Sequence, residues 1–155
     1  MNLTYEMDID APVDQVFFLL DDDTQLKRWM EGLEEIIHPD GRDPENPVGT
    51  RFIQRIREGG RIGTYEGVVT AYEKPYHLAI RFGNKSFTMS VDYRLSELEG
   101  GGTHFAYAAE MVSGSWFTRL MSRLFSGLTR RILNQHMTNL KGLAEGAEAP
   151  SMEAA

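Results

Sequence analysis

Hydrophobic and polar residues alternate along much of this chain, and the alternation predicts about six to seven short β-strands. Leu3, Tyr5, Met7 and Ile9 give the first strand one apolar face, because successive side chains of a strand point to opposite sides. Short glycine-rich links, such as residues 59–60, separate several strands and make the predicted sheet antiparallel. The remaining strands are predicted over residues 33–37, 51–57, 62–72, 78–82, 87–95 and 103–111.

Two short amphipathic helices are predicted between the first strand and the second. Pro12 suits the opening position of the first helix, where the missing N–H of proline costs nothing. Asp23 or Thr24 is expected to cap the second helix, and helix capping and solvation account for the acidic run at residues 21–23 better than a metal site does. The apolar sides of the two helices are expected to be formed by Val13, Val16, Phe17 and Leu20, and by Leu26, Trp29 and Met30.

The last long segment, residues 116–143, is predicted to be a single helix about 40 Å long at 1.5 Å per residue. Its apolar residues recur every three or four positions and so fall on one stripe, which is expected to face the sheet. Ser126-Gly127 lies in the middle of this segment and predicts a kink or hinge there, with close packing of another element on Gly127 as the alternative. The apolar stripe comprises Phe117, Met121, Leu124, Leu128 and Ile132.

The opposite side of the same predicted helix is basic, with Arg119, Arg123, Arg130 and Lys141. A solvated face is the simplest interpretation of these charges. Contact with a membrane surface or with an acidic protein is the alternative interpretation.

These elements predict an α+β fold in which a curved antiparallel sheet wraps around one long C-terminal helix. A sheet curved around a helix leaves a hollow between the two, and we expect this hollow to be the functional part. The inward face of the strand over residues 62–72 is expected to carry Tyr65, Gly67, Val69 and Ala71, although the phase of this strand is left open by its sequence.

The composition narrows the class of protein. A chain of 155 residues with 41% hydrophobic and 25% charged residues fits one globular domain, expected over residues 1–145, followed by a disordered tail at 146–155. The absence of cysteine excludes disulfides and thiolate ligands and agrees with a cytoplasmic location. A net charge of -7 argues against nucleic acid as a partner. Neither a signal peptide nor a transmembrane segment of about 20 apolar residues is expected.

The chain resembles the START-like superfamily, also called SRPBCC or birch-pollen-allergen-like, and within it the polyketide cyclase and dehydrase branch. The resemblance is carried by IDAPVDQVFFLLDD at 9–22, LKRW at 26–29, VGTRF at 48–52, YEGVVTAYEKPYHLAIRF at 65–82 and GGTHFAY at 101–107, and by the terminal helix. It implies the helix-grip fold over nearly the whole chain. Members of the superfamily bind lipids, hormones, polyketides or quinones and only some are enzymes, so the resemblance implies no catalytic residue.

Candidate binding residues are large apolar side chains and polar or tyrosine side chains on the predicted inner faces, which together suit a mainly apolar pocket with a few directed hydrogen-bonding groups. His136 lies on the continuation of the apolar stripe, and it either completes the edge of the core or faces the cavity. The histidines have no metal-ligand spacing, and neither a metal nor a cofactor is expected. The predicted cavity lining is Trp29, Phe52, Gln54, Ile56, Tyr65, Phe82, Phe87, Met89, Tyr93, Phe105, Tyr107, Phe117, Met121, Leu124 and His136.

The sequence therefore favours binding of a small hydrophobic or amphipathic ligand, of lipid, polyketide or aromatic type, between the sheet and the terminal helix. Two alternatives stay open. One is a cofactor-free enzyme of the cyclase or dehydratase type that uses His136 or a tyrosine as acid or base. The other is a protein-interaction module like the chaperone co-activators of the same superfamily. The sequence leaves open the oligomeric state, the identity of the ligand and whether any reaction is catalysed.

Overall fold

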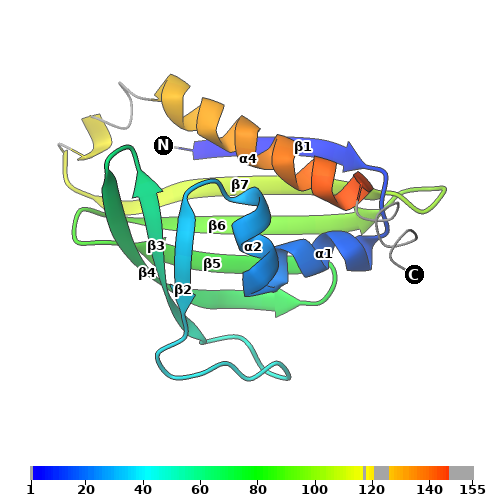
Figure 1. Cartoon of the computed structure of the whole chain (residues 1–155), viewed down its shortest axis with the longest axis horizontal. Helices are drawn as coiled ribbons and strands as arrows, with labels where there is room; N and C mark the ends of the chain where they lie inside the picture. Colours follow the sequence, from blue (N-terminus) through cyan, green and yellow to red (C-terminus); the bar gives the residue numbers. More distant parts are fainter. Residues whose placement is uncertain (1, 117, 121–125, 147–155) are drawn as a thin grey trace.

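Seven antiparallel strands form one sheet in the order β1-β7-β6-β5-β4-β3-β2 (Figure 1). The structure is a computed structural model that describes residues 2–116, 118–120 and 126–146. The strands are β1 (Asn2–Ile9), β2 (Leu33–Ile37), β3 (Arg51–Glu58), β4 (Arg61–Glu73), β5 (His77–Gly83), β6 (Phe87–Glu97) and β7 (Thr103–Gly114). The labelled helices are α1 (Val13–Asp21), α2 (Asp23–Trp29) and α4 (Ser126–Gly146).

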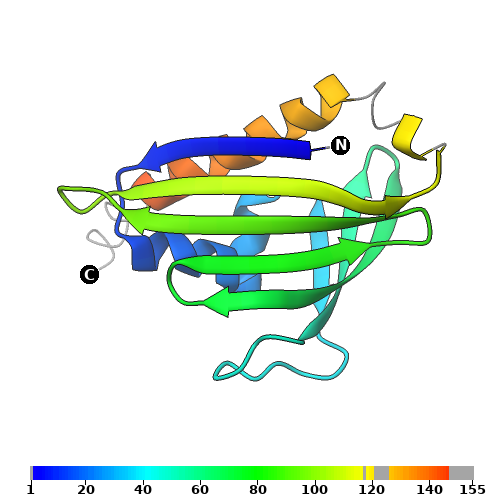
Figure 2. The same ribbon diagram turned by 180° about the vertical axis from the view of Figure 1, so that it is seen from behind.

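All three labelled helices lie on one face of the sheet, as the front and back views together show (Figures 1 and 2). The strands β2 and β3 turn toward this face, so the sheet curves around the space beneath α4. Consecutive strands from β2 to β7 are neighbours in the sheet, and β1 forms one edge by pairing with β7. The predicted α+β class and helix-grip arrangement are confirmed.

The set of β4 side chains that points inward changes at a β-bulge. Its pairing with β5 shifts register between Val69 and Ala71, and one extra residue moves every later side chain to the other face. Tyr72 therefore points inward, with its ring centroid 5.4 Å from that of Phe17. The expectation that Ala71 lies on the inner face is wrong for this reason, whereas Tyr65 and Val69 keep the predicted phase.

Close approach between β3 and β4 depends on Gly67. Gly67 pairs with Phe52 across the two strands, and the Phe52 ring lies directly over it. A Cβ atom at residue 67 would lie 2.2 Å from the Phe52 ring, which no real contact allows. Gly67 thus makes room for one of the large inward side chains.

The core lies under the C-terminal half of α4. The buried side chains of this helix meet Val16 and Phe17 of α1 in one hydrophobic cluster. Leu128 and Ile132 are 55% and 49% exposed, so the expectation that Leu128 is buried is wrong. The helix instead buries a different stripe, which shares no residue with the predicted one. The buried stripe is Leu133, Met137, Leu140 and Ala144.

The described part of α4 begins at Ser126, and Gly127 is its second residue. The helical residues Trp116 and 118–120 lie off the axis of α4 in both ribbon views, which differs from the single helix predicted over 116–143. A Cβ atom at Gly127 would meet nothing within 4 Å, so Gly127 does not make room for another described element. The predicted tail after Gly146 lies outside the described residues.

Within the described ranges, no helix has the length and hydrophobicity needed to cross a bilayer.

Candidate functional site

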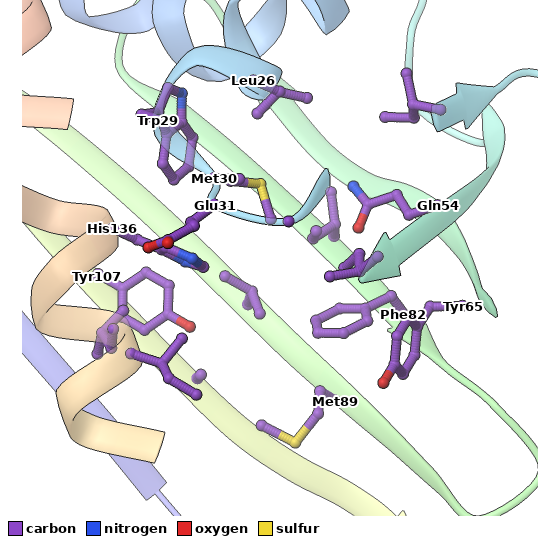
Figure 3. A pocket seen from close by; sticks show the side chains of 18 of the residues that line it. Leu26, Trp29, Met30, Glu31, Gln54, Tyr65, Phe82, Met89, Tyr107 and His136 are labelled. Carbon is purple, nitrogen blue, oxygen red and sulfur yellow. The ribbon is translucent and has the colours of Figure 1, made fainter. Parts of the chain in front are cut away.

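A large cavity lies between the sheet and the helices. Its volume is about 1140 Å³, and its wall is formed by β3 to β7 on one side and by α2, the turn over residues 30–32 and α4 on the other (Figure 3). Gly59 of the β3–β4 hairpin, Thr118, Leu128 and Ile132 also line it. Because Leu128 and Ile132 are about half exposed, we identify this end as the mouth of the cavity.

Most residues that the sequence predicted to line a cavity lie in its wall. Phe105 is an exception, because it is fully buried in the core beside Tyr93, at a ring-centroid distance of 6.0 Å. Phe105 belongs to the hydrophobic cluster that also contains the buried residues of α1 and α4. Phe117, Met121 and Leu124 lie outside the described residues. The residues found in the wall are Trp29, Phe52, Gln54, Ile56, Tyr65, Phe82, Phe87, Met89, Tyr93, Tyr107 and His136.

Sequence reasoning missed several apolar wall residues and four acidic ones, which are Asp21, Asp23, Glu31 and Glu58. Leu78 and Ile80 alternate with Phe82 on β5, so the period of that strand could have identified them. Glu31 follows the end of α2 in a turn, where no periodic pattern indicates a direction. Further missed apolar residues are Leu3, Leu20, Ile36, Val91, Ala109, Leu133 and Met137.

Gln54 places an amide in a mainly apolar wall. The residue is only 7% exposed, and Figure 3 shows its side chain extending from β3 into the cavity. Every fully buried polar side-chain atom of the described residues has a hydrogen-bond partner, yet the Gln54 amide bonds to none of those residues. The amide therefore reaches the surface of the cavity, where a guest molecule can accept from it or donate to it.

Tyr93 and Tyr107 form a pair of phenols on the opposite side. Their ring centroids are 5.4 Å apart in an edge-to-face arrangement. Burial raises the pKa of Tyr107 to about 12, and burial followed by the nearby Tyr107 raises the pKa of Tyr93. Both phenols therefore keep their protons at neutral pH and can donate hydrogen bonds. Neither hydroxyl has a hydrogen-bond partner among the described residues.

Trp29 fixes the corner where α1, α2 and α4 meet. Its indole is 1% exposed, and Nε1 donates to the carbonyl oxygen of Leu19 at 2.8 Å. Asn139 Nδ2 on α4 donates to the carbonyl oxygen of Trp29 at 3.2 Å. The sequence predicted Trp29 as part of the cavity lining, and this buried and hydrogen-bonded indole does line the cavity.

His136 faces the cavity from α4, beside Trp29 and Glu31 (Figure 3). Burial lowers the pKa of His136, and the charge and backbone of Glu31 oppose that shift only in part. The imidazole is therefore neutral at neutral pH, and it can accept as well as donate a hydrogen bond.

The end of the cavity near α1 is held by charged contacts. Arg42 pairs with Asp21, donating also to its backbone oxygen at 2.9 Å, and His38 Nε2 lies 2.7 Å from Asp23 Oδ2. The Tyr72 hydroxyl donates to Asp21 Oδ2 at 2.7 Å, and burial, then Asp21, raises the pKa of Tyr72 to about 12. These contacts attach the loop over residues 39–49 to the helices.

The acidic run at residues 21–23 is thus structural. Asp22, one residue before the predicted cap, accepts from the Thr24 backbone N–H at 2.9 Å and caps α2. Its pKa is lowered, first by the hydrogen bond from the Thr24 side chain. Across the described residues, no group of three or more His, Cys, Asp or Glu side chains is arranged to hold a metal ion.

Comparison with known proteins agrees with this architecture. A family model described as "Polyketide cyclase / dehydrase and lipid transport" matches residues 1–145. The Zhui aromatase/cyclase from Streptomyces sp. R1128 has a TM-score of 0.74 and 15% identity, with 94% of each chain covered. Protein NE0264 from Nitrosomonas europaea has a TM-score of 0.73 and 15% identity, covering 96% of this chain and 97% of its own.

The di-domain aromatase/cyclase StfQ from the steffimycin biosynthetic pathway has a TM-score of 0.73 and 14% identity, covering 95% of this chain and 46% of that one. At such identities these likenesses show a shared fold alone. No curated protein matches the sequence.

Proposed function

The chain belongs to the polyketide cyclase/dehydrase and lipid transport family, and from this premise we propose that it binds a small hydrophobic or amphipathic molecule in the cavity between its sheet and α4. The observation that carries the proposal is the set of polar groups in the wall. The amide of Gln54 and the hydroxyls of Tyr93 and Tyr107 face a mainly apolar space without hydrogen-bond partners among the described residues. Because these groups are accessible from the cavity, a guest that fills it can form hydrogen bonds with them.

The size and chemistry of the cavity support an amphipathic guest. Its volume of about 1140 Å³ is slightly larger than the roughly 300–1,000 Å³ that small-molecule sites occupy. Apolar side chains such as Ile80, Phe82 and Met89 offer an extended hydrophobic surface, and methionine adapts to guests of different shape. Gln54 and Tyr107 extend from opposite sides and would bind a polar head or ring substituents (Figure 3).

Titration with an environment-sensitive apolar dye tests the proposal, followed by competition with a fatty acid, a polyketide and an aromatic phenol. Saturable binding that at least one competitor displaces is expected. Ala109→Phe places a ring in the cavity from β7 and should abolish that binding, because Ala109 is a small residue of the wall.

Ala108→Phe is the matched control. Ala108 is the neighbouring residue on the same strand and is exposed on the other face, so this variant should bind the dye normally. Thermal melts of both variants exclude unfolding as the cause. Absence of saturable binding to the unchanged protein, or equal binding by both variants, would refute an internal site. The first result would favour the interaction-module alternative.

A cyclase- or dehydratase-like reaction is a second candidate function. It is favoured by the position of His136, a neutral proton acceptor, in the same wall as the phenolic donor Tyr107. Together they could remove a proton from an enolisable carbonyl compound and donate one to its oxygen. Incubation with a synthetic poly-β-ketone tests this candidate. His136→Ala should abolish turnover and leave dye binding intact, whereas absence of turnover by the unchanged protein would contradict catalysis.

A further inference from the structure

We propose that the mouth of the cavity docks on an anionic lipid bilayer. The docking surface comprises three parts, namely the tip of the β3–β4 hairpin with Arg61 and Ile62, the helical turn with Trp116, Arg119 and Leu120, and the first turns of α4 with Leu128, Arg130, Arg131 and Ile132. These parts lie at the same end of the molecule in both ribbon views (Figures 1 and 2).

Large hydrophobic side chains are exposed on this surface. Trp116 is 77% exposed, more than any other large hydrophobic residue of the described part. Leu120 and Ile62 are 45% and 41% exposed on the neighbouring segments. Tryptophan favours the interface between water and lipid, because its ring is apolar and its N–H is polar.

Positive charge accompanies these apolar side chains, although the protein as a whole is acidic. Between Glu110 and Glu145 the sequence holds five basic residues and no Asp or Glu, whereas the rest of the chain holds the other 11 basic residues and all 23 acidic ones. Arg119, Arg130 and Arg131 are exposed, and none of them forms an ion pair with a carboxylate of the described residues. Most other arginines on the surface are paired, as Arg57 is with Glu34 at 2.8 Å.

The apolar stripe of this surface runs directly into the cavity. Leu128 and Ile132 are exposed at the surface and also line the cavity wall, as do Arg131 and Thr118. A guest could therefore pass between bilayer and cavity along apolar side chains without crossing water. This use of the surface rests on the proposed function, whereas docking itself depends only on the exposed side chains.

An anionic bilayer fits these features better than other occupants. Nucleic acid would be repelled by a chain with a net charge of -7. A second copy of this acidic chain would bring the same basic surface against its own arginines. Exposed apolar side chains flanked by arginine are the pattern by which amphipathic segments lie in the headgroup region of anionic membranes.

The protein contains two tryptophans, and this makes docking directly measurable. Trp29 is buried at 1% exposure, so Trp116 supplies the fluorescence that responds to the surroundings. Vesicles of phosphatidylcholine with about one third phosphatidylglycerol should shift the emission to shorter wavelength and should carry the protein upward in flotation. Both signals should weaken with added salt and be much smaller with phosphatidylcholine alone.

Two double variants with matched controls distinguish the effect of the docking surface from the effect of net charge or of exposed hydrophobic side chains elsewhere. Arg119→Glu/Arg130→Glu should weaken vesicle binding about tenfold or more, whereas Lys74→Glu/Arg81→Glu makes the same change in net charge elsewhere and should have little effect. Trp116→Ser/Leu120→Ser should abolish flotation, whereas Phe18→Ser/Val48→Ser removes two exposed hydrophobic side chains elsewhere, 50% and 49% exposed, and should not.

Failure of the unchanged protein to bind anionic vesicles would overturn the proposal, as would equal losses in the variants and their controls. A dimer that protects Trp116 without lipid would also overturn it. Dye binding in solution is measured on the same variants. None of the four substituted mouth residues lines the cavity, so a loss of flotation with intact dye binding separates failure of docking from failure of the proposed ligand site.

Discussion

The indole of Trp29 lies edge-on to the imidazole of His136, with 6.4 Å between the ring centroids and 79° between the ring planes. The contact joins the last residue of α2 to the middle of α4, and both rings line the cavity. Protonation of His136 would place a charge in this partly buried position. The protein's stability should therefore depend on pH through this residue.

The direction of this dependence follows from the lowered pKa of His136. The unfolded chain binds the proton more strongly than the folded one, near the ordinary pKa of about 6.5. The contribution of neutral His136 to stability is complete above that pH and is lost as the pH falls toward the lower pKa of the folded state. Urea unfolding should show His136→Gln losing less stability than the unchanged protein between about pH 7.5 and pH 5.5.

His104 provides a control of opposite sign. Hydrogen bonds first to Asp8 and then to Glu6 raise the pKa of His104 on the exposed side of the sheet. Its contribution to stability is present below the ordinary pKa and is lost as the pH rises through the raised value. His104→Gln should thus make the fall in stability on acidification steeper. An unchanged pH profile in His136→Gln would contradict the burial assigned to this imidazole.

Gly67→Ala tests the close approach of β3 and β4. The new methyl group would lie 2.2 Å from the Phe52 ring, so the ring must move. Such overpacking should lower the free energy of unfolding by about 1–3 kcal/mol. Phe52→Leu in the same chain should recover part of the loss, because the smaller side chain vacates the contact.

Gly60→Ala is the control for Gly67→Ala, since a Cβ atom at residue 60 would meet nothing within 4 Å. Urea unfolding of the three variants measures the effect. Equal stability of Gly67→Ala and Gly60→Ala would show that the Phe52 ring does not occupy the space above Gly67.

The sequence predicts most of the fold because alternation and turn residues act locally. β2 has the predicted bounds, and the residues on β3 and β6 face the predicted way. The phase of β4 after Val69 could not be predicted, because a bulge is set by the pairing between strands and leaves no periodic signal. The contact of Arg42 with Asp21 likewise depends on how a loop returns to a helix 21 residues away.

The buried side of α4 could not be predicted from the sequence either, for a different reason. Leu128 and Ile132 form as good an apolar stripe as Leu133, Met137 and Leu140, and helical spacing does not tell a core from the wall of a cavity. Both stripes are apolar, because one packs in the core and the other lines the apolar wall of the cavity. The same ambiguity explains why Phe105 was assigned to the cavity although it lies in the core.

Truncating one leucine from each stripe tests this assignment. Leu140 is fully buried, so Leu140→Ala should lower the free energy of unfolding by about 2–5 kcal/mol. Leu128 is 55% exposed at the mouth of the cavity, so Leu128→Ala should change stability by no more than about 0.5 kcal/mol. Chemical denaturation measures both. If Leu128→Ala lowered the free energy of unfolding by several kcal/mol, the stripe predicted from the sequence would be the buried one.

Gly127 carries the hinge hypothesis, which stays a prediction. It lies in the first turn of α4, next to the mouth of the cavity, and the turn at residues 118–120 lies off the axis of this helix. A glycine costs a helix up to about 1 kcal/mol relative to alanine. A Cβ atom at residue 127 would meet nothing within 4 Å, so alanine can be tolerated there without a clash. Gly127→Ala should therefore stabilise the protein slightly while stiffening the start of α4.

Gly142 allows the stiffening to be separated from the gain in stability. It lies in the same helix, a Cβ atom there would also meet nothing within 4 Å, and it is not part of the cavity wall. Gly142→Ala should raise stability without changing the exchange of a bound dye, whereas Gly127→Ala should slow that exchange in stopped-flow measurements. The hinge would be excluded if both variants gained stability and both exchanged dye at the original rate. Motion at the mouth must then arise elsewhere, because both variants would act on stability alone.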